Sequence, residues 1–262
     1  MKFVFQFVLF LALIYAAGVF FMWRRQEKFL FQPKHYTPPP EFEHFRWDCT
    51  VNGVWHQGWF IDRGKANTII YHGGNAEDLA GHLDVMLAGA DANVLMINYR
   101  GYGMSDGTPG EKEMVADAIA IYDLFHEKTG TPAENIFLMG RSLGTGVAIQ
   151  VAAARAAGGV ILVTPYAKIE DAARLHYPFL PPMKFLLRHP FRSGDYAKNL
   201  KTSVLILLAE HDESVPLSSG QRLAEIYAGE KEIITLPTGH MDIHEHPDYY
   251  KSINRFVNRT AP

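Results

Sequence analysis

The residues whose types and order point most directly to chemistry are a serine, an aspartate and a histidine. Ser142 lies in the stretch GRSLGTG, which contains the pattern Gly-x-Ser-x-Gly. Asp212 follows in AEHDESVP, and His240 follows in GHMDIH. A serine hydroxyl becomes a strong nucleophile when a histidine accepts its proton and a carboxylate orients that histidine. These residue types therefore predict covalent catalysis at an acyl group, with Ser142, Asp212 and His240 as the catalytic residues.

The pattern around Ser142 is short enough to arise by chance, so its interpretation depends on the flanking sequence. The apolar run NIFLM predicts a strand just before the pattern, and LGTGVAIQVAAA predicts a helix that begins within it. A strained strand-to-helix turn exposes the hydroxyl of a nucleophilic serine, and Gly140 and Gly144 keep that turn free of side-chain clashes. We favour this nucleophile elbow over an ordinary turn in which Ser142 only caps the helix.

Asp212 and His240 also come just after predicted strands, SVLILLAEH and KEIITLP. Because parallel strands end at a common edge of a sheet, these two side chains are expected to meet Ser142 there. Glu210 and Glu213 are rivals for the role of the acid. We expect Glu210 to lie still at the strand end and Glu213 on the surface, and we therefore prefer Asp212.

Two further histidines, His244 and His246, follow His240 closely. A metal site made of these three is disfavoured because no carboxylate cluster accompanies them. We expect His244 and His246 to cap or decorate the last helix, and His240, which follows a glycine on a loop, to be the base. The predicted chemistry requires no metal and no organic cofactor.

The reaction also needs two backbone N–H groups that stabilise the negative oxygen of a tetrahedral intermediate. The N–H of Leu143, directly after the nucleophile, is one candidate. The second is expected in YHGGNAED, where the N–H of Gly74 comes first and that of Asn75 next. His72 in the same stretch is expected to hydrogen-bond the backbone and to carry no proton in the reaction.

The elements that position these residues alternate along the chain. From residue 66 onward, short apolar runs alternate with helical stretches, a pattern typical of a parallel sheet with helices on both faces. Before them, two strand-like runs flank Asn52 and Gly53, a strong hairpin signal. The segment 166–199 is rich in proline and aromatic residues and too long for a simple connection. We interpret it as a lid.

Residues 1–25 predict a transmembrane anchor. The stretch 3–23 has Gln6 as its only strongly polar side chain, and a helix of that length spans roughly 30 Å, the thickness of a bilayer's hydrocarbon core. A cleaved signal peptide, with a shorter apolar core, and a buried soluble helix are the alternatives. A small excess of basic residues after the span leans toward a cytoplasmic domain. Residues 26–44, with four prolines, predict an extended tether, and 45–262 the catalytic domain.

The composition excludes several classes of function. The chain has 262 residues, with 25 basic and 28 acidic side chains and a net charge of −3, so it lacks the basic excess of a nucleic-acid-binding surface. Its one cysteine, Cys49, excludes an internal disulfide and a cysteine-based metal cluster. The length suits one large α/β domain.

Five stretches occur in an order that resembles a known family: YHGGNAED, INYRGYGMSDGTPGE, GRSLGTGVA, AEHDESVP and GHMDIH. With the apolar N-terminus they resemble the membrane-anchored serine hydrolases of the α/β-hydrolase superfamily, of the serine-aminopeptidase-like and depalmitoylase-like kind. The resemblance implies the α/β-hydrolase fold, a mostly parallel sheet covered by helices on both faces, with N-terminal antiparallel strands and a short lid. The sequence departs from the family in having both Gly73 and Gly74 where one glycine is usual.

The combined prediction is a serine hydrolase that cleaves an ester, thioester or amide bond through an acyl-enzyme intermediate. Its expected partners are a small or acylated substrate and, through the N-terminal helix, a membrane; no nucleic acid is expected. Two alternatives use the same fold: a catalytically silent binding protein, and an acyltransferase with an acceptor other than water. The aromatic lid favours an apolar acyl substrate. Arg141 is left without a role.

Overall fold

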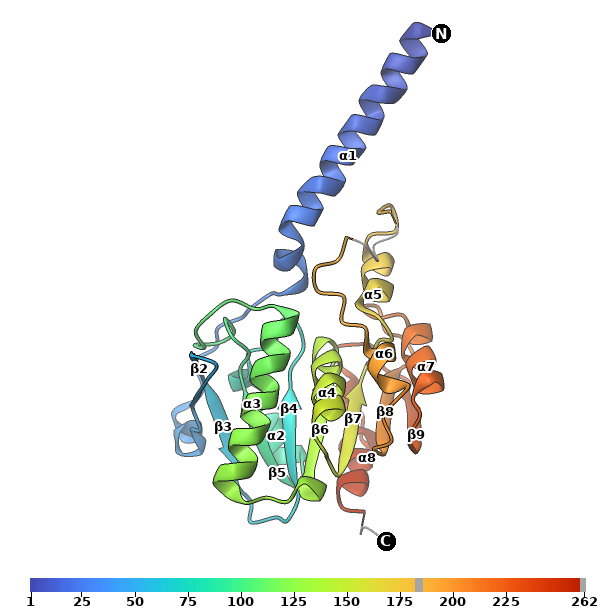
Figure 1. The fold of residues 1–262 in the computed structure, drawn as a ribbon. Coiled ribbons are helices and arrows are strands. Elements are labelled where there is room, and N and C mark those ends of the chain that lie inside the picture. The colour runs from blue at the N-terminus through green and yellow to red at the C-terminus, as the bar shows by residue number, and fades with distance from the viewer. Residues whose placement is uncertain (182–185, 260–262) are drawn as a thin grey trace.

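A sheet of seven strands forms the centre of the computed structural model, which describes residues 1–181 and 186–259. The strands are β3 (Gly58–Ile61), β4 (Thr68–His72), β5 (Asn93–Ile97), β6 (Ile136–Arg141), β7 (Gly159–Val163), β8 (Val204–Ala209) and β9 (Lys231–Leu236). Their order across the sheet is β3-β5-β4-β6-β7-β8-β9 (Figure 1). Strand β3 runs antiparallel to β5, and all other neighbours are parallel.

Helices cover both faces of the sheet. One face carries α3 (Glu111–Thr129), α4 (Leu143–Ala154), α6 (Ser193–Ala197) and α7 (Leu217–Ile226), and the other carries α2 (Leu83–Gly89) and α8 (Asp248–Val257) (Figure 1). Strands β4 to β8 are buried along their whole length, which explains their continuously apolar sequences. The predicted fold class is therefore confirmed. Short 3-10 helices complete these layers: η1 (Pro40–Phe45), η2 (Leu79–His82), η3 (Ala133–Asn135) and η5 (Ile243–Glu245).

The antiparallel hairpin predicted at Asn52 and Gly53 is present. Strand β1 (Cys49–Val51) pairs with β2 (Val54–His56), and the two residues between them form the turn. Both turn residues have positive φ, 49° and 73°. A two-residue hairpin turn demands this left-handed backbone, which asparagine and glycine adopt most readily.

The carboxylate of Asp117 on α3 holds this hairpin to the domain. It accepts hydrogen bonds from Asn52 Nδ2 at 2.9 Å and from Arg100 Nε at 2.7 Å, and it lies 3.3 Å from His56 Nε2. Burial by itself raises the pKa of this carboxyl, but the nearby His56 ring and the hydrogen bonds from Arg100 and Asn52 outweigh burial and lower the pKa to about 2. The charged form therefore stabilises the fold above about pH 4, and this contribution is lost as the pH falls through about 2.

An Asp117→Asn variant is expected to lose about 2–4 kcal/mol of the free energy of unfolding at pH 7, because the partly buried Arg100 loses its anion. The difference from wild type should narrow as the pH falls from about 4 toward 2. Urea unfolding of the detergent-solubilised protein measures both effects. Asp123→Asn is the matched control: its ion pair with Arg155 is solvent-exposed, so it should lose less than about 1 kcal/mol. Equal losses in the two variants would contradict this account of Asp117.

Helix α1 (Lys2–Leu30) is the one helix among the described residues that is long and apolar enough to cross a membrane. A signal sequence near the N-terminus has the same character. Figure 1 shows α1 projecting away from the domain, and its residues as far as 18 are exposed on every side. The helix continues beyond residue 25 and ends at Leu30, after which residues 31–39 form no helix or strand before η1.

The segment predicted as a lid, residues 166–199, connects β7 to β8 and contains α5 (Ile169–His176) and α6. Residues 182–185 of this segment lie outside the described residues. Tyr166 and Phe191 are fully buried. The Ser219 hydroxyl of α7 donates to Asp171 of α5 at 2.6 Å, so the base of the segment is fixed to the domain.

Candidate active site

Ser142 occupies a sharp turn between β6 and α4. Its φ is 49°, in a region that is costly for any residue with a side chain. A Cβ on Gly140 would lie 2.3 Å from the Gly144 carbonyl oxygen, and a Cβ on Gly144 would lie 2.1 Å from the His72 carbonyl oxygen. Larger residues at either position would force the turn open. The two glycines therefore let β6, β4 and α4 approach closely enough to form the turn that carries Ser142.

The side chains of Ser142, His240 and Asp212 form a hydrogen-bonded chain. Ser142 Oγ lies 3.0 Å from His240 Nε2, and His240 Nδ1 lies 2.8 Å from Asp212 Oδ2. The three residues follow β6, β9 and β8 at the carboxyl edge of the parallel sheet. Asp212 Oδ1 also accepts the backbone N–H groups of Ser214 and Val215, at 2.9 and 2.7 Å. These bonds fix the carboxylate, so it can hold the imidazole in one orientation.

The rival residues occupy supporting positions. Glu213 Oε2 accepts the backbone N–H of His240 at 3.1 Å and so steadies the histidine loop. Glu210 is exposed at the end of β8. His246 Nδ1 accepts the N–H of Asp248 at 3.2 Å and thereby caps α8. Within the described part of the chain, only Asp212 contacts the His240 imidazole as an acid.

The two predicted oxyanion donors differ in whether their N–H groups already have a hydrogen-bond acceptor. The N–H of Leu143 is the first amide of α4, so it has no acceptor within the helix. Gly74 lies beside the serine, since a Cβ placed on it would be 3.7 Å from the Ser142 Cβ. Its N–H, however, donates to Glu77 Oε2 at 2.7 Å. The amide that the sequence predicts as an oxyanion donor is therefore already hydrogen-bonded to a carboxylate of the protein itself.

Glu77 and Arg141 form a buried ion pair that the sequence did not reveal. The Arg141 guanidinium donates to Glu77 Oε1 and to the His240 carbonyl oxygen, the latter at 3.1 Å. Glu77 Oε2 also accepts the Tyr71 hydroxyl at 3.0 Å. Arg141 therefore ties the loop that carries Gly74 to the loop that carries His240. The only signal in the sequence was a charged residue within an elbow of otherwise small residues, and no spacing rule joins it to an acid 64 residues away.

His72 does not make the hydrogen bond expected of it. Its side chain is buried, and its Nε2 has no hydrogen-bond partner among the described residues. Burial lowers the pKa of His72 to about 4, so the ring is neutral near pH 7.

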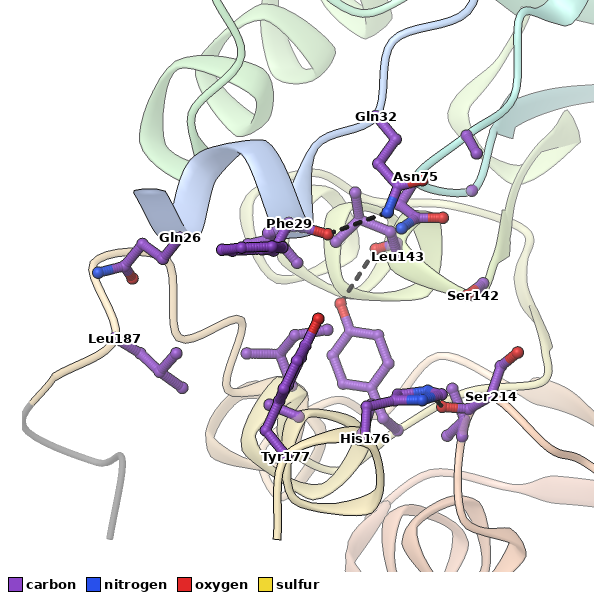
Figure 2. Close-up of a pocket in the computed structure, with 18 of the residues that line it drawn as sticks. Gln26, Phe29, Gln32, Asn75, Ser142, Leu143, His176, Tyr177, Leu187 and Ser214 are labelled. Atoms are coloured by element: carbon purple, nitrogen blue, oxygen red, sulfur yellow. Dashed lines mark hydrogen bonds between the residues drawn. The ribbon is translucent and has the colours of Figure 1, made fainter. Parts of the chain in front are cut away.

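A cavity of about 570 Å³ opens onto Ser142. Figure 2 shows that it lies between the end of α1, the lid and the turn at Ser142. Phe29 from α1 and Tyr177 from the lid approach each other beside it, with ring centres 6.1 Å apart. The lining is mainly apolar and includes Val19, Met22, Trp23, Leu30, Ile169, Ala172, Leu180, Leu186, Leu187 and Val215.

The participation of α1 in this cavity was not predicted. The sequence predicts a membrane anchor followed by a tether for these residues, and neither the apolar run nor the prolines near it indicate a contact with the lid. The structure places the last turns of the helix among the walls of the cavity that opens onto Ser142. A pocket of this size with a few convergent polar groups is typical of a small-molecule site.

Comparisons with known proteins agree with this geometry. Residues 63–192 match the family described as serine aminopeptidase, S33. The chain is 28% identical over 95% of its length to the alpha/beta hydrolase domain-containing protein WAV2 of Arabidopsis thaliana, covering 92% of that protein. It is 26% identical over 87% of its length to the lysophosphatidylserine lipase ABHD12 of Bos taurus, covering 67% of that protein.

Among solved structures, an esterase of Pyrococcus furiosus superposes with a TM-score of 0.72. The superposition covers 88% of this chain and 97% of the esterase, at 19% sequence identity. At that identity the likeness establishes the fold alone. The family match and the lipase relative support a hydrolase.

Proposed function

The chain belongs to the α/β-hydrolase superfamily, and we propose that it is a serine hydrolase that cleaves an ester, thioester or amide bond. The observation that carries this proposal is the position of Ser142 Oγ, 3.0 Å from His240 Nε2, on a turn with positive φ. Such a hydroxyl has a proton acceptor in place and is held at the edge of the cavity. Asp212 supplies the fixed carboxylate that the imidazole requires.

The proposed reaction has two stages. His240 Nε2 removes the proton from Ser142 Oγ while the oxygen attacks the substrate carbonyl carbon, and the resulting imidazolium is stabilised by Asp212. The imidazolium then protonates the leaving group, and an acyl-enzyme on Ser142 remains. In the second stage His240 removes a proton from water, the hydroxide attacks the acyl carbon, and Ser142 regains its proton as the acid departs.

The negative oxygen of each tetrahedral intermediate is proposed to accept the N–H groups of Leu143 and Gly74. For Gly74 this requires the Glu77 carboxylate to release the amide. Arg141 and the Tyr71 hydroxyl remain as partners for Glu77 when it does so. The Glu77 contact is thus replaced by the substrate oxygen at the moment when negative charge develops there.

An apolar acyl group is the proposed substrate part, because the cavity beside Ser142 is lined mainly by aliphatic and aromatic side chains. The name of the bovine relative, a lysophosphatidylserine lipase, favours an ester over an amide. We propose further that α1 anchors the enzyme in a membrane, with residues 45–262 as the catalytic domain on the cytoplasmic side. This placement rests on the apolar helix and the basic residues that follow it.

A fluorophosphonate probe tests the proposal, since it phosphonylates only a serine with an activating base. The full chain in detergent is incubated with the probe, digested, and mapped by mass spectrometry. The expected adduct lies on Ser142, and its formation should abolish hydrolysis of p-nitrophenyl butyrate. An enzyme that hydrolyses this ester without an adduct on Ser142, or a protein that neither reacts nor hydrolyses, would overturn the proposed function.

A further inference from the structure

The last turns of helix α1 differ from the rest of the helix. Residues 2–18 are exposed on all sides, whereas Val19, Met22, Trp23 and Gln26 are partly buried and line the cavity. Their spacing of three and four residues places them on one face of the helix. This face lies against the cavity, so the end of α1 is one of its walls as well as a connection to the span.

Helix α5 forms another wall of the cavity, also with one face of the helix. Ile169, Ala172, Ala173 and His176 of α5 line the cavity, again at spacings of three and four residues on one helix face. The two helix faces are therefore walls of the cavity that opens onto Ser142, and we call the part of the cavity between them the slot. An extended apolar chain suits such a slot, because its burial removes apolar surface from water along the whole length of the chain.

Polar contacts fasten the lid to α1. The Gln26 side-chain amide donates to the Leu186 carbonyl oxygen at 3.1 Å and accepts the Arg188 N–H at 2.8 Å. The Arg188 guanidinium pairs with Glu27 at 3.0 Å and lies over the Trp23 ring, 4.5 Å from its centre. Tryptophan and arginine favour the boundary between a bilayer and water. These contacts thus place the lid at the level where the apolar span ends.

Residues 175–181, which we call the lid tip, reach farther along helix α1. The Tyr15 hydroxyl of α1 donates to the Phe179 carbonyl oxygen at 2.9 Å. Tyr15 precedes Trp23 by about two helical turns, about 12 Å along the axis. Phe179 is 61% exposed and Leu175 is 46% exposed. Side chains of this kind are costly to leave in water but not among lipid acyl chains, and their surface continues into the apolar surface of α1.

We propose that α1 and the lid form an entrance from the bilayer to Ser142. The lid tip is immersed in the leaflet that contains the end of α1, and the substrate is an ester dissolved in that leaflet whose single long acyl chain enters between α1 and α5. This inference rests on the proposed serine hydrolase function and adds its substrate class. The bilayer is the occupant because the exposed tip lies against a helix that is itself apolar on every side.

The first test compares chain lengths. The full chain is reconstituted in phosphatidylcholine vesicles, and kcat/KM is measured for p-nitrophenyl butyrate and p-nitrophenyl palmitate. Met22→Trp places a larger side chain in the slot and should lower kcat/KM for palmitate at least about 10-fold more than it lowers kcat/KM for butyrate. Phe21→Trp is the matched control on the exposed face, and it should change neither.

The second test measures immersion without relying on activity. Cys49 is the only cysteine and is buried, so a cysteine introduced on the surface can be labelled selectively with an NBD fluorophore. A Phe179→Cys variant should be quenched by nitroxide-labelled phosphatidylcholine as strongly as a Phe10→Cys variant within α1. A Glu225→Cys variant on α7, which is exposed, should not be quenched.

The outcomes separate the two proposals. If wild type hydrolyses butyrate but Met22→Trp and Phe21→Trp have equal rates on palmitate, the bilayer entrance is wrong and the serine hydrolase stands. If Phe179→Cys is quenched no more than Glu225→Cys, the lid tip is not immersed and the entrance is again wrong. A wild-type protein with neither butyrate hydrolysis nor reaction with a fluorophosphonate overturns the hydrolase and with it the substrate class.

Discussion

A Ser142→Ala variant is expected to lose about 10⁴–10⁶-fold in kcat/KM toward p-nitrophenyl butyrate. Without the hydroxyl no acyl-enzyme forms, and the remaining rate comes only from the oxyanion donors acting on water. The loss should appear in kcat, because the substitution does not change the side chains of the cavity that are proposed to bind the acyl group. Ser203→Ala is the control and should retain the wild-type rate. The Ser203 hydroxyl donates an exposed hydrogen bond to Glu230. Retention of activity in Ser142→Ala would exclude the proposed nucleophile.

Combining Ser142→Ala with His240→Ala tests whether the two residues act together. Residues that act as one unit have non-additive effects, so Ser142→Ala combined with His240→Ala should be no slower than Ser142→Ala alone. Thermal unfolding of Ser142→Ala should remain close to wild type, whereas the double variant should unfold at a lower temperature because the buried Asp212 loses its histidine partner. Rates are therefore compared at a temperature at which both variants are folded. A double variant that is much slower than Ser142→Ala would mean that His240 acts on something other than the Ser142 proton.

The meeting of Ser142, Asp212 and His240 at one edge of the sheet could be predicted because its physical basis is local. The central strands are buried on both faces, so each appears in the sequence as an unbroken apolar run. Parallel strands end at one edge, and residues such as Asp212 and His240 just past those ends must come near one another. The close approach of the backbones around Ser142 requires glycine at positions 140 and 144. Glycines at these positions are visible in the sequence.

The contacts of α1 could not be predicted in this way. The prolines between residues 33 and 40 predict an extended tether. In the structure residues 31–39 form no helix or strand, and Pro40 begins the 3-10 helix η1. Residues 26–30 continue the helix because Gln, Glu, Lys and Leu favour helical backbone. In addition, Gln26 and Leu30 face the domain and line the cavity. Which face of an all-apolar helix meets a partner depends on tertiary packing, and no periodic pattern in residues 3–23 marks it.

The pair formed by Glu77 and Arg141 was hidden for a related reason. A long-range ion pair leaves no trace in spacing, since either residue alone is compatible with a solvated surface. In the structure both side chains are buried, and the removal of one partner leaves an uncompensated charge in the interior. Because Glu77 accepts the Gly74 N–H, that unpaired charge would lie next to the atom on which the reaction develops negative charge.

An Arg141→Met variant is therefore expected to lose about 3–5 kcal/mol of stability and about 10²-fold in kcat on p-nitrophenyl butyrate, the usual cost of disabling one oxyanion donor. The Michaelis constant should change much less, because the amide of Gly74 is needed mainly when charge develops. Arg155→Met is the matched control, since its ion pair with Asp123 is solvent-exposed, and it should lose less than about 1 kcal/mol and no activity.

The decisive measurement is the double variant Arg141→Met with Glu77→Gln. It removes both charges, so it should regain much of the stability that Arg141→Met loses, and kcat should rise at least about 10-fold above that of Arg141→Met. A purely structural role for Arg141 predicts recovery of stability without recovery of kcat. Additive losses in the double variant would show instead that the two side chains act independently, and Arg141 would then have no part in positioning the Gly74 amide.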